Sequence, residues 1–178
     1  MRLLNKRNVL MRMTNSPKTN GYIDYKGKYL FTDGSYGCVL TDSHGLPKYF
    51  GNRLSAETVD KALSVCNGKP IEDLTEFDRD CRDYEIDLDK VKSCLSSNGQ
   101  PLCRVIIGRC AYNPRYILDL ACVLRPDDAK KGKCLVHYLP KENALLWIFG
   151  YCDGKPAHQE SGFAFPIRGG YRNGDISV

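Results

Sequence analysis

The chain has 178 residues, of which 42% are hydrophobic, and this is enough for one domain to bury a core without disulfide bonds or metal ions. No stretch approaches the roughly 18 apolar residues of a membrane-spanning helix, and the basic N-terminus lacks an apolar signal region. We therefore expect a soluble, cytoplasmic protein without a membrane partner. The net charge of +5 permits a nucleic-acid partner but does not demonstrate one.

The nine cysteines are odd in number and scattered, and none belongs to a CxxC pair. Zinc sites usually contain cysteines about two to four residues apart, so this spacing argues against a zinc site. Several cysteines stand in apolar runs, where a free thiol behaves as a small hydrophobic side chain. We expect reduced cysteines, no bound metal and no cofactor.

The first predicted elements form an antiparallel meander. Strands over Tyr22–Tyr25 and Lys28–Phe31 are separated by Lys26–Gly27, and their aromatic and β-branched residues are typical of a hairpin. Asp33–Gly34 then predicts a second turn before a strand over Gly37–Thr41.

The next segment is less clearly patterned. Ser55 can cap a helix over residues 56–65. Residues 68–84 are polar and acidic, and we interpret them as an insertion in the domain. Residues 84–88 alternate as a strand does, whereas residues 87–95 have helical spacing, and the sequence does not decide between the two.

The clearest element is a helix that begins at Asn113 and Pro114. Asn113 can accept a hydrogen bond from the first turn. Pro114 has no N–H group, but at the first helical position an N–H would have no partner within the helix. Pro126 predicts an end near Leu124 or Arg125. Apolar residues recur at helical spacing: Ile117, Leu120, Ala121 and Leu124. The charged residues are expected on the other, solvated faces: Arg115, Asp119 and Arg125.

Strand-like runs flank this helix: Cys103–Cys110, Lys133–Leu139, Ala144–Tyr151 and Gly162–Ile167. The later strands have hairpin-length connections, which require antiparallel pairing. We therefore predict an α+β fold in which two or three helices cover one face of an antiparallel sheet, in a single domain over residues 1–178. The glycine-rich residues 169–178 are expected to form a loose tail.

Four segments carry a family resemblance. In Tyr112–Asp119 an Asn-Pro helix start precedes Tyr-Ile-Leu-Asp, and the strand-like Val105–Gly108 comes just before it. Phe163–Arg168 is an apolar run that ends in Pro-Ile-Arg, and Lys28–Gly34 runs into Thr-Asp-Gly. In their order and residue pattern these segments resemble the DNA sliding clamps, the ring-shaped polymerase processivity factors. They most closely resemble the last domain of the bacterial beta clamp.

The resemblance implies a single, divergent DNA-clamp-like domain, of a kind that a phage or mobile element could encode. A bacterial clamp subunit has three such domains and an archaeal or eukaryotic one has two, whereas this chain has room for one. The resemblance also implies a helix before the first hairpin, but residues 1–20 are short and polar and give it no clear place. A ring would require a homo-oligomer with complementary edges.

The function implied by the resemblance is a non-catalytic one in DNA replication, as a processivity or DNA-binding factor. Inner helices of a clamp carry cations toward DNA phosphates without reading the bases, and such contacts depend strongly on salt. The candidate DNA-binding residues are Arg115, Arg125, Lys130, Lys131 and Lys133. Arg115 could equally cap or solvate its helix, and the lysines could belong to a solvated loop.

An alternative is a regulatory module that binds a DNA polymerase or another replication protein without binding DNA. Clamps bind short peptides in an apolar groove near the closing strand, and the resemblance places three candidate partner-binding residues there: Phe165, Pro166 and Ile167.

A third possibility is a metal-dependent enzyme that processes nucleic acids. His44 stands in a turn-like loop without a cysteine nucleophile, and Asp33–Ser35 lacks the Gly-x-Ser-x-Gly pattern that would expose a serine. Gly34–Gly37 and Arg168–Gly170 lack the spacing of phosphate-binding loops. We therefore predict no catalytic residues and expect the protein not to be an enzyme.

Overall fold

The structure is a computed structural model that describes residues 5–14, 21–25, 27–49, 82–124, 132–140, 145–152, 155–169 and 173–178. These residues contain three helices: α1 (Lys6–Thr14), α4 (Leu88–Ser93) and α5 (Pro114–Leu124). They also contain ten strands: β1 (Ile23–Tyr25), β2 (Lys28–Thr32), β3 (Tyr36–Leu40), β4 (Arg82–Asp87), β5 (Val105–Ile107), β6 (Cys110–Tyr112), β7 (Lys133–Leu139), β8 (Leu145–Cys152), β9 (Lys155–Ala164) and β10 (Ile176–Ser177).

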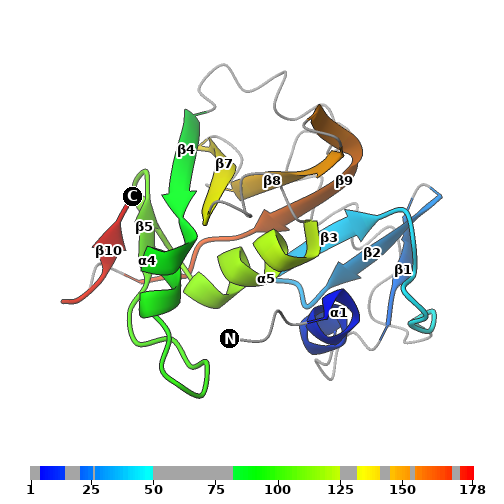
Figure 1. The fold of residues 1–178 in the computed structure, drawn as a ribbon, viewed down its shortest axis with the longest axis horizontal. Helices are drawn as coiled ribbons and strands as arrows, with labels where there is room; N and C mark the ends of the chain where they lie inside the picture. Colours follow the sequence, from blue (N-terminus) through cyan, green and yellow to red (C-terminus); the bar gives the residue numbers. More distant parts are fainter. Residues whose placement is uncertain are drawn as a thin grey trace.

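Seven strands form one antiparallel sheet in the order β1-β2-β3-β9-β8-β7-β4. The pairing of β3 with β9 joins the N-terminal meander to the later strands, with Tyr36 opposite Ala164 and Val39 opposite Ser161. Figure 1 shows the helices on one face of this sheet, with α5 between α4 and α1. The predicted α+β class and the antiparallel pairing of this sheet are confirmed.

The two predicted turns of the meander are also confirmed. Tyr25 pairs with Lys28 across the first turn, where Gly27 has a φ of 78° that suits glycine. In the second turn, the Asp33 carboxylate accepts hydrogen bonds from the N–H groups of Ser35 at 2.7 Å and Tyr36 at 3.2 Å. The Asp33–Ser35 segment is thus a turn stabilised by its own aspartate.

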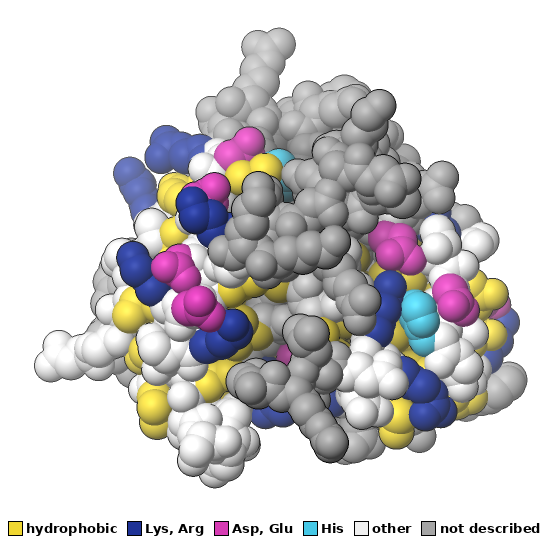
Figure 2. Space-filling view, in the orientation of Figure 1, with side chains coloured by type: hydrophobic (Ala, Val, Ile, Leu, Met, Phe, Trp, Pro, Cys, Tyr) yellow, Lys and Arg dark blue, Asp and Glu magenta, His cyan; other side chains and the backbone are white. Residues whose placement is uncertain are grey.

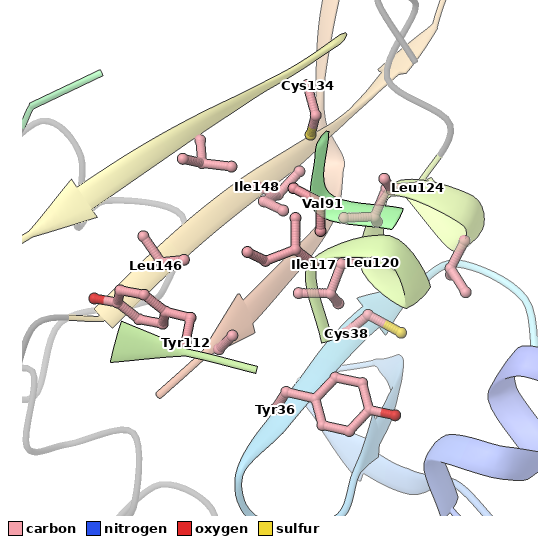
Figure 3. Close-up of a cluster of buried hydrophobic side chains, with 14 of the residues drawn as sticks. Tyr36, Cys38, Val91, Tyr112, Ile117, Leu120, Leu124, Cys134, Leu146 and Ile148 are labelled. Carbon is pink, nitrogen blue, oxygen red and sulfur yellow. The ribbon is translucent and has the colours of Figure 1, made fainter. Parts of the chain in front are cut away.

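The helix α5 begins and ends where the sequence predicts. Asn113 accepts a hydrogen bond from the Arg115 N–H at 3.0 Å through its side chain, and Pro114 is the first helical residue. The buried side of α5 contacts β3, β8 and β9. Figure 3 shows Ile117, Leu120 and Leu124 gathered with Leu146 and Ile148 of β8 in the core.

A close approach of helix and sheet sets the distance between α5 and β9. A Cβ atom on Gly162 of β9 would lie 2.7 Å from Leu120 Cδ2 and 2.9 Å from Leu124 Cδ1. Such distances are well inside van der Waals contact, so glycine at this position lets α5 lie directly on β9.

Residues 6–14 form a helix, although the sequence gives no clear position for a helix before the first hairpin. Three buried side chains, Val9, Leu10 and Met13, attach α1 to the core, and Met13 contacts the Cys38 thiol on β3 at 3.9 Å. These three apolar side chains are the only sequence signal of the helix among polar neighbours. Helix α1 lies over β2 and beside α5.

The ambiguous segment after residue 81 contains both predicted elements. Strand β4 ends at Asp87, whose side chain accepts hydrogen bonds from the N–H groups of Asp89 at 2.9 Å and Lys90 at 3.2 Å. This N-cap starts α4 at Leu88. The predicted helix over residues 56–65 lies outside the described residues. So does most of the predicted insertion over residues 68–84, whose last three residues belong to β4.

The predicted strand over Cys103–Cys110 is wrong as a single strand. The chain turns at Gly108, which has a φ of 60°, so that β5 and β6 form a hairpin before α5. With β10 they make a second sheet, in which β10 runs parallel to β5.

The prediction of a loose tail over residues 169–178 is wrong for residues 173–178. Strand β10 pairs with β5, and Asp175 forms a bidentate ion pair with Arg104, with nitrogen–oxygen distances of 3.2 Å and 2.7 Å. Both side chains are buried, at 9% exposure for Arg104 and 6% for Asp175. Removing one partner of a buried pair of this kind costs about 3–5 kcal/mol, because it leaves the other charge buried and unpaired.

The contact between α5 and β9 can be tested by adding one methyl group. We expect Gly162→Ala to destabilise the protein by about 1–3 kcal/mol, because the new Cβ overpacks the core against Leu120. Leu120→Ala alone should cost about 2–5 kcal/mol through the cavity that it leaves. Denaturant unfolding of the double variant should show a cost smaller than the sum, by at least about 0.5 kcal/mol. Strictly additive costs would contradict this close approach.

Candidate functional site

Of the five predicted DNA-binding residues, the structure describes Arg115 and Lys133, whereas Arg125, Lys130 and Lys131 lie outside the described residues. Arg115 stands in the first turn of α5, and its side chain is half-buried. Its Nη1 donates a hydrogen bond to the carbonyl of Gly99 at 3.3 Å. Arg115 thus holds the loop that follows α4. It lies on the same side of the sheet as the helices.

Lys133 lies on the opposite face of the sheet from the helices. Its neighbours Cys134 and Val136 are buried in the core under the helices, and side chains alternate between faces along a strand. Lys133 forms an ion pair with Glu85, which points to the same face from β4. The sheet therefore separates Lys133 from Arg115, and the two do not form one site.

Helix α1 gives the basic N-terminal residues a fixed place in the structure, where they form a cationic surface. The helix contains three basic residues and no acidic one. Lys6 contacts Glu160 at 3.5 Å, and Arg12 pairs with Asp119. Arg7 is exposed, and no described side chain pairs with it.

Helix α4 adds further cations on the same face of the sheet. Lys90 and Lys92 are exposed, and Lys92 pairs with Asp89 at 2.6 Å on the helix surface. Exposed pairs of this type contribute little to stability, so the lysine is available to another anion. We use the term helix surface for the exposed side of the helix layer with these cations: Lys6, Arg7, Arg12, Lys90, Lys92 and Arg115.

The position of α1 depends on a buried carboxylate. Asp119 is buried in α5, although the helical pattern predicts it on a solvated face. It accepts a hydrogen bond from the Tyr36 hydroxyl at 3.0 Å and pairs with Arg12, and so it joins β3, α5 and α1. Tyr116 stacks on Tyr36 with ring centroids 4.0 Å apart and planes 9° from parallel.

Burial dominates the titration of this group. Desolvation raises the pKa of Asp119 above its ordinary value of 3.8, although Arg12 and the Tyr36 hydroxyl oppose the shift. Burial and the nearby carboxylate likewise raise the pKa of Tyr36, which keeps its hydroxyl protonated as a donor. The network is therefore a structural link between elements, with its polar atoms satisfied internally.

Figure 2 shows the charged side chains of the face that carries the helices. Lys and Arg side chains are spread over its described surface, with Asp and Glu beside several of them.

A separate pocket of about 250 Å³ lies between β6 and the segment that follows β9. It is lined by Arg109, Cys110, Ala111, Pro166, Ile167, Arg168 and Gly169. The Ile167 N–H donates to the Ala111 carbonyl at 2.8 Å, which holds the two sides together. The pocket thus contains two of the three predicted partner-binding residues. Phe165 does not line it, because its ring packs edge-on against Phe163 with centroids 5.9 Å apart.

Of the residues considered for catalysis, His44 lies beside Asp42. The His44 Nδ1 contacts the Asp42 carboxylate at 3.5 Å, and desolvation lowers the pKa of His44. No cluster of three or more His, Cys, Asp or Glu side chains that could hold a metal occurs among the described residues. Of the described helices, none has the length and apolar character needed to cross a bilayer.

No protein family, no curated protein and no solved structure matches the chain.

The buried carboxylate predicts a particular dependence of stability on pH. Because the pKa of Asp119 is raised in the folded state, that state holds the proton more tightly than the unfolded chain does. The stabilisation from proton binding by Asp119 is complete below the pKa of the unfolded chain. It is lost as pH rises through the raised pKa of the folded state. We therefore expect the free energy of unfolding of the wild type, minus that of Asp119→Asn, to fall as pH rises above the ordinary pKa of 3.8.

Chemical denaturation of both proteins across this range measures the difference, and the neutral variant cancels the titration of all other groups. A difference that grows with pH would mean that the pairing with Arg12 outweighs burial and would contradict the raised pKa.

Proposed function

We propose that this chain is a non-catalytic, DNA-clamp-like domain that binds duplex DNA through its helix surface, as a processivity or DNA-binding factor in DNA replication. The observation that carries the proposal is the helix layer, which presents six cations on one face of the sheet. Contacts of lysine and arginine with phosphates supply affinity without reading the bases.

The charge balance of the two faces of the sheet favours the helix surface. On the opposite face, Lys133 pairs with Glu85, and His137 lies 2.7 Å from Asp83. On the helix surface, Lys6 and Lys92 contact the acids Glu160 and Asp89, the acid partner of Arg12 is buried, and no described side chain pairs with Arg7 or Lys90. Among the described residues, Arg7 and Lys90 are therefore the cations that a phosphate group would meet without an acidic partner.

The arrangement of helices over an antiparallel sheet is the part of the clamp resemblance that bears on this proposal. In a clamp ring the helices face the DNA and the sheets form the outside. A ring of this chain would require its edge strands, β1 and β4, to meet edges of other copies, and we include a homo-oligomer in the proposal.

Salt dependence of DNA binding tests the proposal. Each phosphate neutralised contributes a slope of about −0.9 to log K against log salt concentration. We expect the combined substitution Arg7→Ala and Lys90→Ala to weaken binding to a short labelled duplex and to reduce the magnitude of that slope by about 2. Fluorescence anisotropy over a series of salt concentrations measures both quantities.

Lys133→Ala is the matched control, because it removes one exposed cation from the opposite face. It should leave the slope within error of the wild type. An equal loss in the control and in the double variant would place the contact elsewhere, and absence of any affinity at low salt would refute DNA binding.

The pocket beside β6 favours a second candidate function, a regulatory module that binds a replication protein such as a DNA polymerase. Ala111, Pro166 and Ile167 give the pocket an apolar lining, and Arg109 and Arg168 contribute to it with positive charge. This combination suits a short peptide in which an apolar side chain stands next to an acidic one.

Peptide display on the folded protein tests the second candidate. We expect selection of peptides with an apolar residue beside Asp or Glu, and we expect Ile167→Asp to weaken their binding at least about tenfold, because a carboxylate would be buried in an apolar site. Duplex DNA affinity, measured in parallel, should not fall in this variant. Peptides without this composition, or peptides that bind the variant equally well, would contradict the assignment of the pocket.

A further inference from the structure

A short loop between α4 and β5 has a cysteine at each base. Cys94 is the C-cap residue of α4, and Cys103 stands just before β5. The Leu102 N–H donates to the Cys94 carbonyl at 2.8 Å, and Leu95 pairs with Pro101 as an antiparallel bridge. These backbone contacts hold the outgoing and returning segments of the loop side by side.

The two side chains at the base of the loop are neighbours. The Leu102 N–H that bonds to the Cys94 carbonyl belongs to the residue next to Cys103, the Cys103 thiol is close enough to raise the pKa of Cys94, and both cysteines are free. Cys94 is fully buried, whereas Cys103 is partly exposed. A disulfide requires Cα atoms about 4.4–6.8 Å apart, and the backbone hydrogen bond between Cys94 and Leu102 holds Cys103 on the segment next to Cys94.

We propose that Cys94 and Cys103 form a reversible intrachain disulfide that fastens the loop over residues 95–102 between α4 and β5. The oxidant is a small-molecule disulfide. Cys103, the accessible thiol, loses its proton and attacks one sulfur of the oxidant, which gives a mixed disulfide and releases one thiol. The Cys94 sulfur loses its proton, attacks the Cys103 sulfur and expels the second thiol. Two electrons and two protons thereby pass to the oxidant.

The order of the two steps follows from burial. Burial and the neighbouring Cys103 raise the pKa of the Cys94 thiol to about 12, so little of it is thiolate at neutral pH. The rate of ring closure should therefore rise with pH.

The disulfide would act on a part of the helix surface. Gly99 lies within the closed loop, and its carbonyl accepts the hydrogen bond from Arg115. The adjoining Arg104 pairs with Asp175. The disulfide would thus restrain a junction where α4, β5, α5 and β10 meet. The proposal holds whether or not the helix surface binds DNA.

Mass spectrometry of the full chain gives a direct test. Trypsin cleaves after Lys92 and Arg104, and no other Lys or Arg lies between them, so both cysteines fall in one peptide, residues 93–104. The protein is incubated with oxidised glutathione, its free thiols are blocked with N-ethylmaleimide under denaturing conditions, and it is digested. We expect peptide 93–104 to carry no blocking group and to be about 2 Da lighter than its reduced form, with reversal by dithiothreitol.

Three results would overturn the proposal: blocking groups on both cysteines, glutathione retained on Cys103, or a bond from either cysteine to another peptide. Cys110→Ser is the matched control, because Cys110 is also partly exposed, and this variant should still form the light peptide.

Thermal melting gives a second readout. Closing a loop of this size should raise the melting temperature of the oxidised wild type by about 5 °C. This rise should be retained in Cys110→Ser and absent in Cys103→Ser. The measurement on the wild type does not depend on the folding of any variant.

Discussion

The buried carboxylate of Asp119 is the interaction on which the helix surface depends. Helix α1 has nine residues, fewer than an isolated helix needs to be stable in water, so its position must come from tertiary contacts. Its apolar side chains attach it to the core, and Arg12 attaches it to Asp119, which in turn accepts a hydrogen bond from Tyr36 on β3. Through this link the basic side of α1 faces outward beside α5. Without it, only the apolar side chains of α1 and the contact between Lys6 and Glu160 would hold the helix in place.

The seven-stranded sheet divides the charged residues into two groups with different surroundings. On the side without helices, basic and acidic residues stand opposite each other on β4 and β7, as in the pairs Lys133–Glu85 and His137–Asp83. On the helix side, Lys6 and Lys92 also have acidic partners, Glu160 and Asp89, but the acid that pairs with Arg12 is buried and no described side chain pairs with Arg7 or Lys90. The proposal that this face meets phosphate depends on these last two cations more than on the total charge of the chain.

Local chemistry made some elements predictable from the sequence, and contacts between distant residues made others unpredictable. The cap at Asn113 and the turn at Gly27 act within a few residues, and both elements were predicted correctly. The burial of Asp119 was missed because the helical pattern places a charged residue in water unless its partner, here 107 residues away, is known. The tail was misjudged for the same reason, since Arg104 and Asp175 are 71 residues apart. Of the candidate site, the sequence identified Arg115 but could not show that Lys133 points to the other face.

Backbone amide NMR of the isotope-labelled protein, titrated with a short DNA duplex at low salt, tests the central claim most directly, because it reports the contacted elements without any substitution. The account predicts that chemical shifts change in α1, α4 and the first turn of α5, and that the changes vanish as salt is raised. Changes confined to β6 and residues 166–169, or to the face of β7 that carries Lys133, would contradict the assignment of the helix surface as the DNA-binding face.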